Sequence, residues 1–138
     1  MSTHMTPSQL LATLTRQHAD IRERISRCDQ LADRFDADLL DPAQLLQEVA
    51  ALRIAFDDHN QFEERALGPI LLDADWLGAV RTARMVEDHV EEHRALGRDL
   101  DTSTAAELRA VLASLRKHLE AEERYFLTRK VLRDDLAG

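Results

Sequence analysis

The sequence predicts an all-α protein, an antiparallel four-helix bundle with up-down-up-down connections. Ala, Leu, Arg, Glu and Asp dominate its 138 residues, whereas four Gly, three Pro, one Trp, one Tyr and four Phe leave little material for turns and strands. Hydrophobic residues recur every three or four positions in four stretches, and capping or turn residues bound each stretch. At this length the whole chain, residues 1–138, is expected to form one domain.

The first helix is expected to begin at Thr6-Pro7-Ser8-Gln9, where a capping threonine, a first-turn proline and a reciprocating glutamine form a start signal. The Asp-rich residues 36–41 end it. Its expected core-facing positions are Leu11, Leu14, His18, Ile21, Ile25, Cys28, Ala32 and Phe35. The second helix begins at Asp41-Pro42-Ala43-Gln44, and Gly68-Pro69 is expected to end or bend it near Leu67. Its expected core-facing positions are Leu45, Val49, Leu52, Phe56, His59, Glu63, Ala66 and Ile70.

A short connection through Trp76 leads to a third helix, expected over about residues 77–100. Its core-facing positions are Ala79, Thr82, Val86, His89, His93, Leu96 and Leu100. Residues 101–103 form the next turn, and Thr104-Ala105-Ala106-Glu107 has the form of a capping box. The fourth helix places inward Leu108, Val111, Leu115, His118, Glu122 and Tyr125. The charged tail, residues 128–138, is expected to be a short extra helix or a frayed end, and residues 1–5 resemble a cloning remnant with Met5 as the natural start.

Composition and charge exclude several classes of protein. The net charge of −8 repels phosphate backbones and argues against nucleic acid as a partner. The longest apolar runs are far shorter than the ~20 residues that span a bilayer, so no membrane partner is expected. The N-terminus lacks the basic start and apolar stretch of a signal peptide, which predicts a cytoplasmic protein. The one cysteine, Cys28, is interpreted as a small buried hydrophobe.

Five of the six histidines occupy core-facing positions, where an unpaired polar group is costly. They are His18, His59, His89, His93 and His118, and two glutamates, Glu63 and Glu122, share these positions. A single histidine in such a place is usually a hydrogen-bonded core residue, but five of them with two carboxylates cannot all satisfy one another. A pH switch built from the histidines is a further alternative. We interpret the seven side chains as metal ligands.

The spacing of these residues suits one site. Three pairs lie four residues apart, so each pair projects from one helix face across one turn; they are His59 and Glu63, His89 and His93, and His118 and Glu122. The interval from His18 to residue 35 equals the interval from residue 42 to His59, which places both histidines at one level of the bundle. His93 lies about 10 residues before the turn near residue 103, but His118 lies about 15 residues after it, so a tilted helix or an uneven loop is needed there.

Imidazole and carboxylate together suit iron, manganese or zinc, whereas a calcium site is all oxygen and a structural zinc site is usually rich in sulfur. Seven ligands are too many for one tetrahedral ion and suit two ions bridged by two carboxylates. The pattern His-x-x-x-Glu-Glu-Arg occurs at residues 59–65 and 118–124, on helices expected to be diagonal, as a quasi-twofold two-metal site would require. Glu64, Glu92 and Glu123 are expected to face solvent, although one of them could support a ligand. Tyr125 is a candidate for a hydroxyl beside the metals.

These motifs resemble the hemerythrin-like proteins of the bacterial type, the family of the HHE cation-binding domain, over about residues 10–127. Ferritin-like bundles use Glu-x-x-His instead, which this chain lacks. The resemblance implies that His89, His93 and His118 hold one iron. It implies that His18 and His59 hold a second iron with an open position for dioxygen. Glu63 and Glu122 would bridge the two ions together with an oxo or hydroxo group, and zinc or manganese are the expected substitutes for iron.

The resemblance implies a non-haem di-iron protein that binds dioxygen, for carriage, storage or sensing, and favours a binding protein over an enzyme. The alternatives are an enzyme acting on nitric oxide or peroxide at the same centre, and a regulatory module that responds to iron or oxygen. One departure separates the chain from the invertebrate oxygen carriers. Their last motif ends with an aspartate five residues after its histidine, whereas the carboxylate here is Glu122, four residues after His118.

Overall fold

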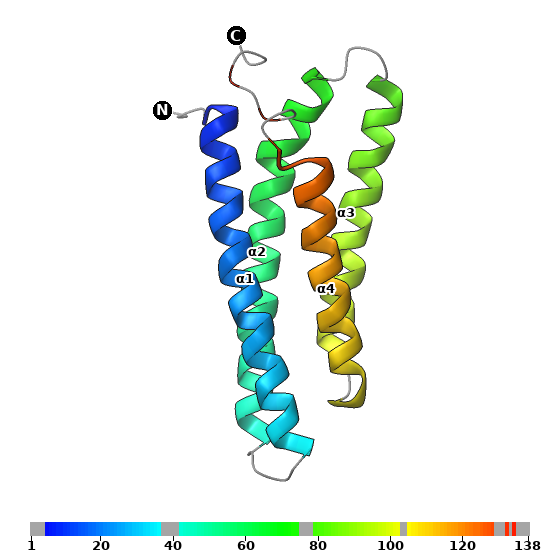
Figure 1. The fold of residues 1–138 in the computed structure, drawn as a ribbon. Coiled ribbons are helices and arrows are strands. Elements are labelled where there is room, and N and C mark those ends of the chain that lie inside the picture. The colour runs from blue at the N-terminus through cyan, green and yellow to red at the C-terminus, as the bar shows by residue number, and fades with distance from the viewer. Residues whose placement is uncertain are drawn as a thin grey trace.

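The part of the chain that the computed structural model describes forms an antiparallel four-helix bundle in up-down-up-down order, as the sequence predicts (Figure 1). The helices are α1 (Pro7–Asp36), α2 (Pro42–Ala74), α3 (Ala79–Thr102) and α4 (Ala105–Tyr125). The structure describes residues 5–36, 42–74, 79–102, 105–128, 132 and 134, with the backbone alone at 35, 36, 42, 68–74, 79–86, 101, 102, 105 and 106. Packing of α1 on α2, α2 on α3, α3 on α4 and α4 on α1 leaves α2 and α4 diagonal.

The start of α1 follows the predicted capping box. The backbone amide of Gln9 donates to the hydroxyl of Thr6 over 3.2 Å, and the backbone amide of Thr6 donates to the side-chain oxygen of Gln9 over 2.9 Å. Two amides that the first turn leaves without helical partners are thereby satisfied. The cap fixes where α1 begins and therefore the height of every later residue on it.

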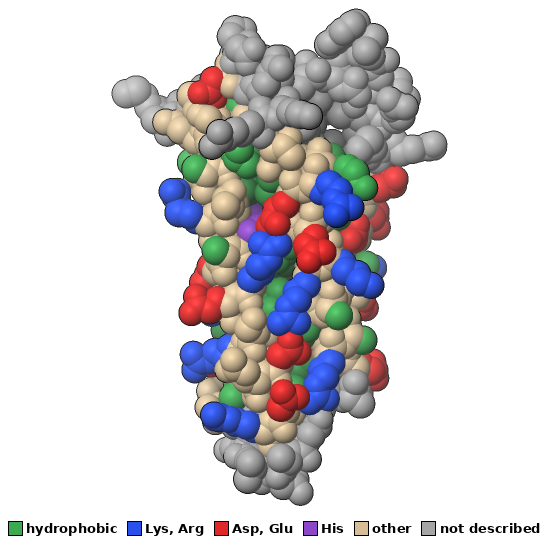
Figure 2. All heavy atoms as spheres, viewed as in Figure 1, with side chains coloured by type: hydrophobic (Ala, Val, Ile, Leu, Met, Phe, Trp, Pro, Cys, Tyr) green, Lys and Arg blue, Asp and Glu red, His purple; other side chains and the backbone are tan. Residues whose placement is uncertain are grey.

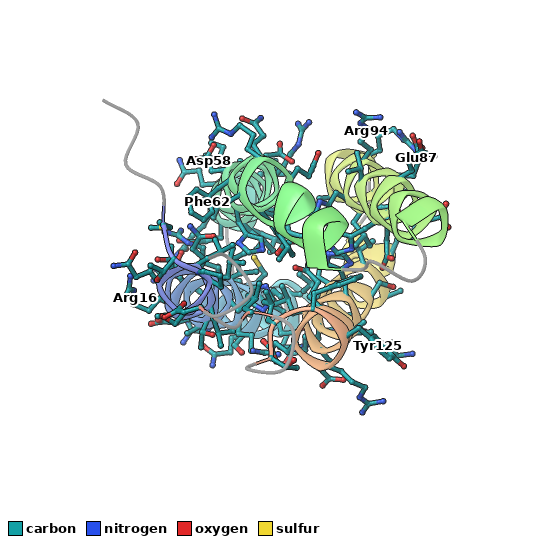
Figure 3. All side chains as sticks on the ribbon, turned by 90° about the horizontal axis from the view of Figure 1, so that it is seen from above. Arg16, Asp58, Phe62, Glu87, Arg94 and Tyr125 are labelled. Atoms are coloured by element: carbon teal, nitrogen blue, oxygen red, sulfur yellow. The ribbon has the colours of Figure 1, made fainter. Side chains whose placement is uncertain are left out.

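The sequence predicted that α2 ends or bends near Leu67, and the first alternative is wrong, because the helix continues through Gly68 and Pro69 to Ala74. Proline removes one helical hydrogen bond and clashes with the preceding turn, which bends a helix without necessarily stopping it. Figure 3 shows the last turns of α2 set across the end of the bundle relative to the turns below. Several sequence predictions lie outside the described residues: the connection at Trp76, the cap at Thr104, and the inward side chains of Phe35, Ile70, Ala79, Thr82 and Val86.

The core consists of two apolar clusters with a polar layer between them. The larger cluster fills the half of the bundle where α1 and α3 end and α2 and α4 begin, and its fully buried members include Ile25, Phe56 and Leu115. The smaller cluster, with Leu10 and Leu14, closes the half where α1 begins and α4 ends. The labelled charged side chains point away from the bundle axis in the end view (Figure 3); they are Arg16, Asp58, Glu87 and Arg94. The two clusters exclude water from both sides of the layer between them.

Ion pairs follow the line where α1 packs against α4. Arg22 meets Glu123 with a shortest nitrogen–oxygen distance of 2.6 Å, and Arg116 meets Asp29 over the same distance. Figure 2 shows the acidic and basic side chains alternating along this face of the molecule. No helix among the described residues is long and apolar enough to cross a membrane.

Part of the C-terminal tail folds back onto the beginning of α1. Leu132 is 2% exposed and joins the smaller cluster. The carboxylate of Asp134 accepts hydrogen bonds from the backbone amide and from the hydroxyl of Ser8, each over 2.8 Å. An anionic side chain at this helix end is favoured by the helix dipole and by the free amides of the first turn.

Candidate metal centre

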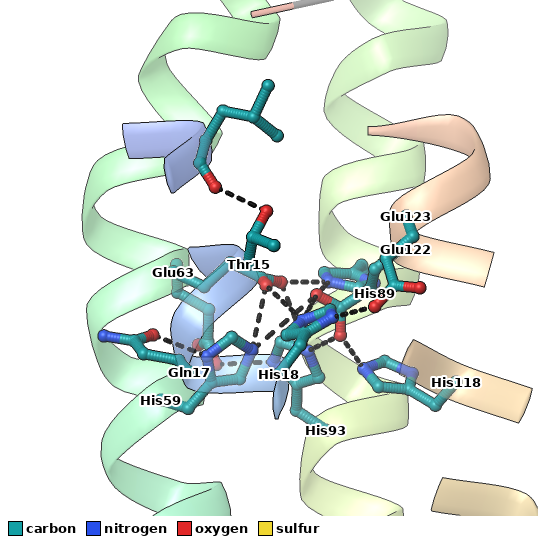
Figure 4. Close-up of polar contacts among 12 residues, drawn as sticks. Thr15, Gln17, His18, His59, Glu63, His89, His93, His118, Glu122 and Glu123 are labelled. Atoms are coloured by element: carbon teal, nitrogen blue, oxygen red, sulfur yellow. Dashed lines mark hydrogen bonds and ion pairs between the residues drawn. The ribbon is translucent and has the colours of Figure 1, made fainter. Parts of the chain in front are cut away.

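All seven predicted ligand side chains lie together in the polar layer (Figure 4). Helical spacing places them there, since His18 lies one turn after Leu14 and one turn before Ile21 on the same face of α1. In the same way, Phe56 of the larger cluster comes one turn before His59 on α2. Each helix contributes at least one donor, so the layer forms only when all four helices are packed.

The positions of the histidines along the bundle axis agree with the prediction in the α1–α2 hairpin. In the α3–α4 hairpin they differ from it. The ring centroids of His18 and His59 are 4.8 Å apart, as expected for residues at one level. In the second hairpin, however, the level partner of His118 is His89, whose ring stacks on it at 5.0 Å and 16°. The interval from His89 to residue 103 equals the interval from residue 104 to His118, so this hairpin is symmetric about its connection. His93 lies one turn nearer the connection and still brings its ring centroid to 4.7 Å from that of His118.

Glu63 presents one oxygen to each side of the layer. Its Oε2 lies 3.1 Å from Nε2 of His59 and 3.9 Å from Nε2 of His18. Its Oε1 lies 2.6 Å from Nε2 of His89 and 3.6 Å from Nε2 of His93. A carboxylate placed in this way can bind one cation with each oxygen.

Glu122 faces both sides from the opposite corner of the bundle. Its Oε2 lies 3.5 Å from Nε2 of His18 and 3.8 Å from Nε2 of His59. Its Oε1 lies 3.5 Å from Nε2 of His93 and is in direct contact with Nε2 of His118. The two glutamates therefore form a pair that separates two histidines from three.

Two groups of donor atoms fit a metal ion each. In each group the donor atoms lie within 4.8 Å of one another. One group consists of His89, His93, His118 and Glu122, and the other of His18, His59, Glu63 and Glu122. Because Glu122 belongs to both groups, the two positions adjoin.

The chemistry of the buried atoms also fits cations. Several ring nitrogens and carboxylate oxygens in the layer are buried without a hydrogen-bond partner; they are Nε2 of His18, His59, His93 and His118, Oε2 of Glu63, and both carboxylate oxygens of Glu122. Each such atom costs about 1–3 kcal/mol when nothing compensates it. Lone pairs of imidazole and carboxylate that converge on two points are compensated by bound cations, whereas water satisfies them only in part.

A closed ring of hydrogen bonds orients four of the five histidines. In each case Nδ1 contacts a side-chain oxygen of a neighbouring helix; the pairs are His18 with Glu123 (2.8 Å), His59 with Gln17 (2.6 Å), His93 with Glu64 (3.0 Å) and His118 with Glu92 (2.9 Å). These oxygens only accept, so Nδ1 carries the proton and Nε2 turns its lone pair towards the centre. This arrangement fixes the tautomer and makes the imidazole a better metal ligand.

The ring corrects the sequence-based interpretation of its acceptors. Glu92 is exposed, as expected, and Glu64 and Glu123 are partly buried. One of the three was expected in a supporting role, but all three accept from a histidine of the layer. Gln17 was missed altogether. The signal that could have found it is its place in the chain, because every acceptor is the immediate sequence neighbour of a predicted ligand.

Burial and the carboxylates act in opposite directions on the pKa values of the layer. Burial disfavours the charged form of His59, but its contacts with Glu122 and Glu63 prevail and raise its pKa to about 9. Burial likewise opposes protonation of His118, yet Glu122 and Glu92 raise the pKa of this histidine. Burial favours the protonated form of Glu122, but its close contacts with Glu63 and with the surrounding imidazoles hold its pKa well below the usual range. Protons and cations therefore compete for the Nε2 atoms of these imidazoles.

Tyr125 does not lie where the sequence predicted it. Its side chain is 62% exposed and points away from the bundle (Figure 3). Phe126 takes the inward place, because its backbone amide bonds to the carbonyl of Glu122 and its ring centroid lies 5.3 Å from that of His89. An apolar ring, and not a hydroxyl, therefore borders the layer at this end of α4.

Comparison with known proteins agrees with this geometry. Searches of curated proteins and of solved structures gave no match. The family model described as the hemerythrin HHE cation binding domain matches residues 9–129, which include all seven predicted ligands and all four helices except the first two residues of α1. With this match over most of its length, the chain belongs to the hemerythrin HHE cation-binding family.

Proposed function

We propose that the protein is a non-haem di-iron protein that binds dioxygen at the polar layer, for storage, sensing or carriage. The observation that carries the proposal is the composition of the layer, in which five histidines surround two carboxylates. Neutral imidazoles keep the total ligand charge low and suit iron at a site that must bind and release a small neutral molecule.

The distances support a division of the ligands between two ions. His89, His93 and His118 would hold one iron, and His18 and His59 the other. Glu63 and Glu122 would bind both ions, because each glutamate turns one oxygen to either side. The ion with two histidines would have one protein ligand fewer and so a position for an external molecule. Bound ferrous iron would supply the electrons that dioxygen binding requires.

The residues around the layer support this chemistry by excluding water and fixing the ligands. Phe56 is fully buried, and its ring centroid lies 6.0 Å from those of His93 and His118. Leu14 covers the other side of the layer. A dry surrounding protects reduced iron from water and from side reactions.

The test is iron content together with an oxygen-dependent visible spectrum. We expect about two irons per chain and an absorption change that appears with oxygen and reverses when oxygen is removed. The variant Glu122→Gln removes a shared ligand and should lose iron, whereas Glu120→Gln, an equal change of charge at an exposed position of α4, should keep both ions. One zinc per chain, or a spectrum that oxygen does not change, would contradict the proposal.

Iron removal provides a second test that does not depend on oxygen. Without iron, the buried polar atoms of the layer would lose the cations that compensate them. A ligand that binds only the folded state stabilises it by about 2.7 kcal/mol when its free concentration is 100 times the dissociation constant. The apoprotein should therefore melt at a clearly lower temperature than the iron form. Equal melting temperatures would show that the layer does not bind the metal.

A further inference from the structure

His89 is the most exposed of the five histidines in the layer. Its side chain is 14% exposed, whereas the side chains of His18, His59, His93 and His118 are only 1 or 2% exposed. Its Nε2 nevertheless reaches Oε1 of Glu63 over 2.6 Å. One end of this ring therefore touches the centre while the side chain remains accessible from outside.

His89 also stands outside the ring of hydrogen bonds that orients the other four histidines. Among the described residues, its Nδ1 has no acceptor of the kind that Glu123 offers to His18. It is held by ring packing instead, against His93 at 4.2 Å, His118 at 5.0 Å and Phe126 at 5.3 Å. Packing is not directional, and no Nδ1 hydrogen bond within the described part of the chain ties the ring of His89 to a neighbouring helix, so His89 can turn outward without breaking such a bond, whereas each of the other four histidines must break one.

A surface pocket of about 230 Å³ between α3 and α4 opens beside this histidine. Three predicted ligands line it, namely His89, His118 and Glu122, and the last two carry buried atoms without a partner. The larger groove between α1 and α2, about 630 Å³, is lined by one predicted ligand, His59. The smaller pocket is therefore the more direct opening to the centre.

The charges at the two openings differ. Asp88 and Glu92 line the α3–α4 pocket, and no lysine or arginine does so among the described residues. Arg16 and Arg24 line the α1–α2 groove and offset its two aspartates. A mouth whose described charged residues are all acidic concentrates cations, and the gain is greatest for a divalent ion.

We propose that the α3–α4 pocket is the port through which a divalent cation reaches the centre, and that His89 is the ligand that moves aside and closes last. Asp88 and Glu92 attract the ion at the mouth. His118 and Glu122 receive it, and His89 then returns over it. This inference rests on the proposed function only in requiring that the centre binds iron.

The experiment measures how fast the apoprotein takes up ferrous ammonium sulfate without oxygen, and how fast a strong chelator removes the iron. Ala121→Phe narrows the α3–α4 pocket from an exposed position on α4. Ala55→Phe does the same to the α1–α2 groove and is the matched control.

We expect Ala121→Phe to slow uptake and removal alike, on the order of tenfold, because it raises the barrier and leaves the equilibrium unchanged. Ala55→Phe should match the wild type. The proposed port would be refuted if Ala121→Phe took up and released iron as fast as the wild type, or if Ala55→Phe alone slowed these rates.

A charge variant keeps the proposal testable if the phenylalanine distorts α4. Asp88→Asn should slow uptake at low salt, and the difference should vanish at high salt as the field is screened. Glu87→Gln removes the same charge one residue away and outside the pocket, so it should have a smaller effect. Equal effects of the two variants would refute steering by the port. A wild-type protein that takes up no iron at equilibrium would instead refute the proposed function.

Discussion

Glu123 supplies the sharpest test of the hydrogen-bond ring, because one carboxylate there serves two partners. Its Oε2 accepts from Nδ1 of His18 over 2.8 Å and from one terminal nitrogen of Arg22 over 2.6 Å. Its Oε1 accepts from the other terminal nitrogen of Arg22 over 2.7 Å. Arg22 and His18 together lower the pKa of Glu123 against the opposing effect of burial. In Glu123→Gln the amide keeps the shape but has one oxygen and one NH2 group. The amide oxygen can take the place of Oε2 and still accept from His18, but it is a neutral acceptor that makes the imidazole less basic than a carboxylate does, and the NH2 group turns a donor towards Arg22.

The cost should fall on His18 and not on Arg22. The side chain of Arg22 is 38% exposed and can turn to water, whereas that of His18 is 1% exposed and has no such alternative. Mutation of the carboxylate that supports a metal-binding histidine typically weakens metal binding about 10- to 100-fold. That range corresponds to about 1.4–2.7 kcal/mol. We expect Glu123→Gln to weaken iron binding within it.

The assay is a competition for iron with a chelator of known affinity. Two controls separate the direct bond from general charge effects. Glu120→Gln makes the same change at an exposed position one turn away on α4 and should leave the affinity unchanged. Arg22→Gln removes the ion pair but leaves the His18 bond, and its effect should stay within about fivefold, as for a surface pair worth at most about 1 kcal/mol. Equal affinities of Glu123→Gln and Glu120→Gln would refute the reasoning.

Three further predictions concern other parts of the molecule. Phe56→Ala should destabilise the apoprotein by about 3–5 kcal/mol in chemical denaturation, because Phe56 is fully buried; a loss under about 1 kcal/mol would contradict its place in the core. Burial raises the pKa of Cys28 to about 11, so a thiol reagent at pH 8 should label it only after unfolding, and rapid labelling of the native protein would disprove its burial. Hydrogen bonds from Ser8 hold the pKa of Asp134 below its ordinary value of 3.8, so their stabilisation is present above that value and is lost as the pH falls through the lower, folded value. Asp134→Asn should therefore melt below the wild type at pH 7, and the difference should close in acid; a constant difference would exclude this charge effect.

The fold was predictable because its signals are local. The capping box at Thr6 and the proline at position 42 mark helix starts through hydrogen bonds and backbone geometry confined to one turn. The interruption at Gly68-Pro69 misled the prediction, because tertiary packing can keep a helix going past a proline. The expected core was also too narrow. Leu112 and Leu119 are fully buried beside the predicted line on α4, since the buried face of a bundle helix is more than one residue wide.

The ligand side chains were predictable for a different reason. A polar residue at an apolar position is an anomaly that one sequence can reveal, and seven such anomalies define one layer. The acceptors carry no such anomaly, because Glu64, Glu92 and Glu123 occupy positions where a helix normally carries solvent-exposed charge. The prediction for Tyr125 was wrong in the opposite sense, since this residue was expected to face inward. The end of α4 exposes Tyr125 and brings Phe126 inward instead.

The order of the ring nevertheless follows from helix geometry once the topology is known. Each helix carries an acceptor beside a predicted ligand, and each acceptor serves the histidine of the next helix in chain order, with α4 serving α1. The acceptor comes one residue before the ligand on α1 and α3, and one residue after it on α2 and α4.

Successive helical residues are rotated by about 100°, so a neighbour of an inward ligand points to one adjoining helix. Neighbouring helices run in opposite directions. If every acceptor is to point to the next helix in the same direction around the bundle, it must therefore precede the ligand on one helix and follow it on the next. The pairs Gln17-His18, Glu63-Glu64, Glu92-His93 and Glu122-Glu123 obey this alternation. The second glutamate of the repeated His-x-x-x-Glu-Glu motif is thereby explained as the acceptor for the next helix.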